Sequence, residues 1–165
     1  MNTKSIFPTE KWDFRSNNIF SDLSIEDTIT LTAHQSEQVY NKGEIVFREG
    51  GVPAGIFYIK SGKVKKYKTV DGSGEQIIYV ANTGEFIGYH AVLSEERYPD
   101  SAAVLEESVI VFIPKEDFLS VLNNSAILSG RLLKLLSHEF KVLINGLALF
   151  PSELLGSDLP CNLLC

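Results

Sequence analysis

Residues 84–103 read GEFIGYHAVLSEERYPDSAA, and this stretch decides the fold. It has the layout of a phosphate-binding cassette: a strand ends at a tight glycine turn, a short helical segment follows, and Ser101-Ala102 begins the next strand. Backbone N–H groups at such a turn can hold an anion. The layout predicts a binding module made of short strands.

Further strands and turns are expected on both sides of the cassette. From residue 39 to 113, turn signals rich in Gly, Asn and Asp recur about every 8 to 12 residues, as in an all-β sandwich or barrel. Ile56–Ile59 and Ile77–Val80 are apolar on both faces, which predicts central strands. The expected strands, rich in β-branched and aromatic residues, are Glu44–Phe47, Gly55–Lys60, Val64–Val70, Gln76–Ala81, Ala102–Leu105 and Val109–Ile113.

Helical signals flank this β region. Ser24 is a candidate N-cap, Pro114 opens a helix with acids in its first turn, and a long helix is predicted from about Ser125 to Phe150. The fold class is mainly β with flanking helices, a jelly-roll-like β-roll followed by a long C-terminal helix. We expect an N-terminal helical segment at 1–35, a β-roll with a short following helix at 36–123, the long helix at 124–150 and an irregular tail at 151–165.

The long helix carries apolar residues at steps of three or four, and further apolar residues lie outside this seam. A helix that is apolar on more than one side needs two partners. We predict that one face packs on the β-roll and the other on a second copy of the chain as a short coiled coil, although packing within its own domain is the alternative. The predicted dimer seam is Leu128, Leu132, Leu136, Phe140, Leu143, Leu147 and Phe150.

Composition excludes several classes of protein. The net charge is −6, which argues against direct binding of nucleic acid by this chain. The most apolar stretch contains five titratable side chains, and no signal peptide is evident, so we expect a cytoplasmic protein with no membrane partner. The two cysteines, Cys161 and Cys165, lie in the last five residues and cannot form a disulfide framework or a four-cysteine metal site.

Several motifs resemble the sensory half of the CRP/FNR family of bacterial transcription regulators. The similar region runs from Tyr40 to Phe150, and its motifs are Tyr40–Glu44, Phe47–Gly50, Gly55–Ile59, Ser61–Val64, Gly84–Gly88, Ser101–Ala103 and the helix bearing Phe118. This resemblance implies a cyclic-nucleotide-binding-domain β-roll, a dimerisation helix and, after it, a winged-helix domain through which such regulators contact DNA.

The resemblance also implies where a cyclic nucleotide would be held. Family members that bind one use a Glu after Phe-x-Gly for the ribose and an Arg before Ser/Thr-Ala for the phosphate, and here these positions are Tyr89 and Asp100. A buried phosphate needs a cation or several donors, so we expect that cyclic AMP is not the ligand. The expected pocket comprises Phe86, Ile87, Gly88, Tyr89, His90, Ala91, Arg97, Tyr98, Asp100, Ser101 and Ala102.

Two basic features are candidate anion sites. Arg97 could reach an anion over the N–H groups of Gly88 and Tyr89 if its loop folds back, which leaves open a stand-alone domain that binds a cyclic nucleotide or another small anion. A solvated loop residue is the other interpretation, and the one we favour. Five lysines crowd one hairpin and are interpreted as a solvated strand face guarded against edge pairing: Lys60, Lys63, Lys65, Lys66 and Lys68.

Catalysis and metal chemistry find little support in the residue pattern. His90 has no second His or Cys at ligand spacing, so we interpret it as a hydrogen-bonded or exposed imidazole rather than a metal ligand. A cupin-type metalloenzyme would need two or three converging His, and no nucleophile–base pair is evident. We predict no enzyme activity, no metal, no haem and no iron–sulfur cluster. The residue pattern leaves open both the existence and the identity of a small-molecule effector.

The tail from Pro151 to Cys165 has no clean periodicity. The family resemblance places the start of a helix-turn-helix there, and the hypothesis is that a frameshift or premature stop removed it, with a docked apolar tail as the alternative. We therefore predict the ligand-sensing and dimerisation module of a CRP/FNR-like regulator that reaches DNA only through a domain missing from this chain.

Overall fold

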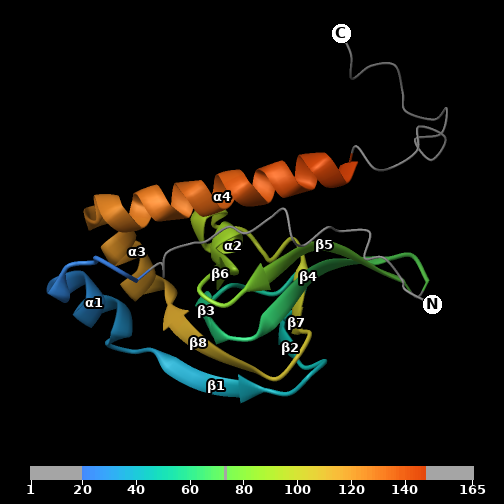
Figure 1. The fold of residues 1–165 in the computed structure, drawn as a ribbon, viewed down its shortest axis with the longest axis horizontal. Coiled ribbons are helices and arrows are strands. Elements are labelled where there is room, and N and C mark those ends of the chain that lie inside the picture. Colours follow the sequence, from blue (N-terminus) through green and yellow to red (C-terminus); the bar gives the residue numbers. More distant parts are fainter. Residues whose placement is uncertain (1–19, 73, 148–165) are drawn as a thin grey trace, which may run out of the picture.

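A computed structural model describes residues 20–72 and 74–147, which form a β-roll with a long helix lying across it (Figure 1). Two four-stranded antiparallel sheets have the orders β1-β8-β3-β6 and β2-β7-β4-β5. The strands are β1 (Ser36–Tyr40), β2 (Ile45–Phe47), β3 (Gly55–Ser61), β4 (Lys63–Val70), β5 (Gly74–Asn82), β6 (Phe86–Ile87), β7 (Ser101–Val104) and β8 (Ser108–Pro114). The predicted fold class is confirmed.

The central place of β3 was predicted correctly, but that of β5 was not. β3 lies between β8 and β6, whereas β5 is at the edge of its sheet and pairs with β4. The apolar character of β5 has another cause, because its Tyr79 ring packs edge-on against His138 of the long helix, with ring centroids 6.0 Å apart. β4 itself is an interior strand that pairs with both β5 and β7. The interpretation of its lysines as guards of a free edge is therefore wrong.

The described residues contain the helices α1 (Ile25–Thr32), α2 (Tyr89–Ser94), α3 (Lys115–Asn124) and α4 (Ala126–Leu147). Ser24 caps α1 as predicted, because its hydroxyl accepts a hydrogen bond of 3.0 Å from the Asp27 N–H. Pro114 precedes α3, whose first turn contains two acidic residues, Glu116 and Asp117. Residues 148–150 of the predicted long helix and the tail at 151–165 lie outside the described residues.

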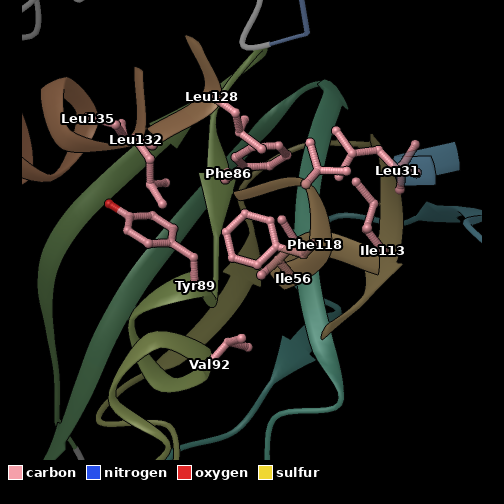
Figure 2. Close-up of a cluster of buried hydrophobic side chains, with 12 residues drawn as sticks. Leu31, Ile56, Phe86, Tyr89, Val92, Ile113, Phe118, Leu128, Leu132 and Leu135 are labelled. Carbon is pink, nitrogen blue, oxygen red and sulfur yellow. The ribbon is translucent and has the colours of Figure 1, made fainter. Parts of the chain in front are cut away.

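The first half of α4 is part of the hydrophobic core. Leu128, Leu132 and Leu135 are at most 4% exposed and pack in one cluster with side chains from α1, α3 and the β-roll. Figure 2 shows these leucines above Phe86 and Tyr89, with Phe118 and Leu31 closing the cluster from the other helices. The structure thus places two residues of the predicted dimer seam, Leu128 and Leu132, inside the domain.

Candidate functional site

The cassette backbone has the predicted form. β6 ends at Ile87, Gly88 follows in a left-handed conformation (φ +79°), and α2 begins at Tyr89. A Cβ atom at Gly88 would touch the rings of Phe47, Phe57 and Tyr98, each at 3.4 Å. These are ordinary van der Waals contacts, so it is the left-handed backbone angle that favours glycine here. The short turn therefore delivers Tyr89 and His90 at the first positions of α2.

A buried lysine lies beside Asp100, the cassette position at which the family resemblance implies an arginine. Lys66, from β4, is 4% exposed, and its ammonium nitrogen lies 3.5 Å from Oδ2 of Asp100 and 3.1 Å from Oε2 of Glu139. Asp100 and Glu139 are each 5% exposed. Lys66 comes from β4, Asp100 from the loop before β7 and Glu139 from helix α4. The positive charge of Lys66 is therefore neutralised by carboxylates of the protein itself.

Glu139 is the centre of this network. One of its oxygens accepts a hydrogen bond of 2.8 Å from the Tyr89 hydroxyl, and the other lies 2.9 Å from Nε2 of His90. The Tyr89 and His90 rings stack with centroids 4.2 Å apart, which fixes both side chains. Among the described residues, no buried side-chain nitrogen or oxygen lacks a hydrogen-bond partner. The network is therefore complete without a bound ligand.

Burial and charge act in opposite directions on these carboxyl groups. Burial alone would raise the pKa of Glu139, but the hydrogen bond with His90 and the positive charge of Lys66 lower it to about 2. Burial raises the pKa of Asp100, and the Lys66 charge offsets only part of that rise. The closer carboxylate, Glu139, is thus the main counter-ion of Lys66. Burial and the adjacent Glu139 carboxylate also raise the pKa of the Tyr89 hydroxyl, which remains a hydrogen-bond donor.

A second buried carboxylate shapes the turn into the cassette. Glu85 accepts hydrogen bonds from the Tyr79 hydroxyl and, at 2.6 Å, from the Asn82 N–H. Burial raises the pKa of Glu85. Its contacts lie within the β5–β6 connection, so this residue fixes the turn rather than a ligand.

Arg97 does not join the charged group. Its guanidinium donates a hydrogen bond of 2.8 Å to the carbonyl oxygen of Gly50, in the loop before β3. The neighbouring Tyr98 ring stacks on Phe47 with centroids 4.2 Å apart, and the Ser101 hydroxyl accepts a hydrogen bond of 2.9 Å from the Glu49 N–H. These contacts anchor the loop between α2 and β7 to β2 and to the residues that follow it.

The predicted pocket residues therefore separate into two groups. Tyr89, His90 and Asp100 meet in the charged network, while the remaining side chains are mostly packed in the core or hold the loop. In the core are Phe86, Ile87, Ala91, Tyr98 and Ala102. The imidazole of His90 is hydrogen-bonded, as predicted, and 31% of its side chain is exposed.

Sequence reasoning missed Lys66 and Glu139, although each carries a signal. Lys66 is two residues from the buried Val64, and alternate residues of a strand share one face. Glu139 follows Leu135 by four residues and so continues the buried stripe of α4. Both residues thus occupy inward positions of their elements, where a charged side chain needs a partner of opposite charge.

A β-roll with a glycine-turn cassette between β6 and β7, and a long helix packed over that cassette, defines a nucleotide-sensor type of fold. The chain belongs to the cyclic nucleotide-binding domain family, which matches residues 37–125, and its resemblance to the sensory domain of CRP/FNR regulators is confirmed.

Three similar proteins illustrate this relationship. The cyclic AMP receptor protein of Thermus thermophilus is 22% identical over 127 residues, which are 77% of this chain and 59% of that protein. The transcriptional activator protein FnrA of Stutzerimonas stutzeri is 33% identical over 102 residues, 61% of this chain and 41% of that protein. The sensor domain of the transcriptional regulator DNR from Pseudomonas aeruginosa has a TM-score of 0.61 at 26% identity, covering 73% of this chain and 85% of that structure.

The chain spans about half the length of the curated relatives that it matches. Within residues 20–147, the described helices include none that is long and apolar enough to cross a membrane. The same part of the chain contains no group of three or more His, Cys, Asp or Glu side chains that could hold a metal ion.

Proposed function

We propose that the chain is the non-catalytic sensing and dimerisation module of a CRP/FNR-type transcription regulator, and that its cassette does not take a cyclic nucleotide. DNA would be bound through a separate domain, in the cytoplasm, and no haem or iron–sulfur cluster is part of the proposal. The observation that carries it is the pairing of Lys66 with Asp100 and Glu139. The cation that could receive a cyclic phosphate is already neutralised, and a phosphate placed there would meet two carboxylates.

Calorimetric titration tests the cassette. We expect neither cyclic AMP nor cyclic GMP to bind at micromolar concentrations, because either phosphate would have to displace a buried carboxylate from Lys66. The cyclic AMP receptor protein of Thermus thermophilus, titrated in parallel, serves as the positive control. Micromolar binding of either nucleotide to this chain would show that the cassette still functions.

The proposed dimer face lies on the side of α4 that points away from the roll. Its apolar residues follow one another at steps of three, four, three and four, the heptad spacing of a two-stranded coiled coil. They are 37% to 64% exposed, so the described part of the chain leaves a contiguous apolar surface here. A second copy presents the same face and would cover it symmetrically. This face comprises Leu133, Leu136, Phe140, Leu143 and Leu147.

Compared with the predicted seam, this face replaces Leu128 and Leu132 by Leu133. The reason is geometric: steps of four advance 400° around a helix of 100° per residue, so the run 128-132-136-140 drifts from the buried side to the exposed side. Phe150, the last residue of the predicted seam, lies outside the described residues.

Sedimentation velocity at tens of micromolar protein tests the dimer. We expect the unmodified chain to be a dimer and Leu143→Lys to be a monomer with an unchanged circular dichroism spectrum, because Leu143 is 44% exposed in one copy. Ile25→Lys is the matched control, since Ile25 is 82% exposed on α1, away from the proposed face. A monomeric unmodified chain, or a Leu143→Lys variant that still dimerises, would contradict the proposal.

A further inference from the structure

Helix α4 is held on the roll by two different kinds of contact. Its first half is held by apolar packing of Leu128, Leu132 and Leu135. After these leucines, Glu139 is the last side chain of the helix that is fully buried, and beyond it only Val142 packs partly against the core. The fully buried apolar side chains of α4 therefore end where the charged network begins, and Val142 adds a partial contact beyond it.

We propose that Glu139 is a built-in ligand of the cassette, whose carboxylate clamps the second half of α4 onto the β-roll with no effector bound. Three side chains from two elements meet the carboxylate: Lys66 of β4, and Tyr89 and His90 of α2. In this arrangement a group from α4 makes the cassette contacts that an external anion would otherwise make.

The Glu139 carboxylate stabilises the docked position of α4, because no other described group can take its place beside Lys66 and Tyr89. Lys66 is buried, and without Glu139 its nearest anion would be Asp100, 3.5 Å away. Tyr89 is fully buried and would lose the acceptor of its hydroxyl. Releasing α4 thus leaves a buried cation and a buried hydroxyl with poorer partners, and each such loss is costly.

The clamp also positions the proposed dimer face, and this link to the dimer rests on the proposed function. Phe140, Leu143 and Leu147 lie on the second half of α4, the part that Glu139 anchors. The docking of α4 on its own roll is nevertheless a property of one chain. It can be measured in the Leu143→Lys variant, in which a partner no longer protects the helix, so that failure of the clamp and failure of the dimer are distinguishable.

Hydrogen exchange followed by mass spectrometry or NMR provides the test, with Glu139→Gln introduced into the full Leu143→Lys chain. Gln keeps the size of the side chain but removes its charge. We expect amides 140–147 to exchange about tenfold faster, whereas amides 126–135 change less than about twofold, because only the second half of the helix loses its anchor. Tyr89→Phe, which removes one hydrogen bond to Glu139, should give a smaller change in the same segment.

Glu37→Gln is the matched control. It breaks the exposed Lys60–Glu37 ion pair, 2.7 Å long, and should leave α4 exchange unchanged. The proposal is overturned if Glu139→Gln and Tyr89→Phe leave amides 140–147 unaffected. It is equally overturned if both halves of α4 lose protection to the same extent, since Glu139 would then support the domain as a whole rather than clamp one segment.

Discussion

Replacing Lys66 by Met should destabilise the protein by about 3 to 5 kcal/mol at pH 7, the usual effect of removing one partner from a buried ion pair. Met has a similar length and shape, so little packing is lost, but Asp100 and Glu139 remain buried without their cation. Lys68→Met is the matched control from the same strand. The side chains of its partner Glu49 and of Lys68 are 39% and 45% exposed. Because the pair is exposed, the control should lose no more than about 1 kcal/mol of unfolding free energy.

The effect of Lys66→Met should depend on pH. Burial already raises the folded-state pKa of Asp100 above its ordinary value of 3.8, and loss of the Lys66 charge raises it further, while the pKa of Glu139 rises from about 2. For Asp100 the unfolded state then releases its proton first as the pH rises, so the penalty is greatest at pH 7 and shrinks as the pH falls towards 4.5. Urea unfolding at both pH values measures this. A penalty equal to that of Lys68→Met, or one independent of pH, would refute the reasoning.

Three further predictions concern acid stability, strand packing and helix propensity. Because the pKa of Glu139 is lowered from 4.5 to about 2, its ionisation should contribute about 3 kcal/mol of stability above pH 4.5 that is lost as the pH falls from 4.5 to about 2. The difference in unfolding free energy between the unmodified chain and Glu139→Gln should shrink over that window, and a constant difference would contradict this. Gly55→Ala should cost about 1 to 3 kcal/mol in thermal or urea unfolding, because its new Cβ would lie 2.1 Å from the carbonyl oxygen of Ile113. Gly130→Ala, with open space around the new methyl group in mid-helix, should instead stabilise the protein by up to about 1 kcal/mol, and a loss of stability there would contradict the helix-propensity argument.

The sequence predicts the β-roll well, since glycine turns and β-branched runs are local signals. It does not reveal β1, whose residues Ser36–Val39 are exposed and show no alternation, so that only pairing with β8 makes them a strand. It also misplaces β5, because an edge strand covered by α4 has the same apolar composition as a central one.

The candidate site is predictable only in part. The substitutions at Tyr89 and Asp100 are visible within one continuous cassette, and the structure brings both side chains to the charged network. Lys66 and Glu139 are 73 residues apart in the sequence, and their contact depends on how α4 crosses the roll. Strand alternation and helix periodicity place each of them on an inward face, but neither pattern shows that the two faces meet.

The packing of Leu128, Leu132 and Leu135 also determines how the protein can be divided for experiments. An expression fragment that stops at Asn124 would leave Leu31, Phe86 and Phe118 open to water where α4 now covers them. Such a fragment should aggregate or bind hydrophobic dyes, whereas one that ends soon after Leu135 would keep this apolar cluster whole and lose the Glu139 network, the Tyr79–His138 ring contact and the partial packing of Val142. We therefore expect the smallest folding unit to end partway along a continuous helix, so that the remaining turns can change their attachment without unfolding the rest.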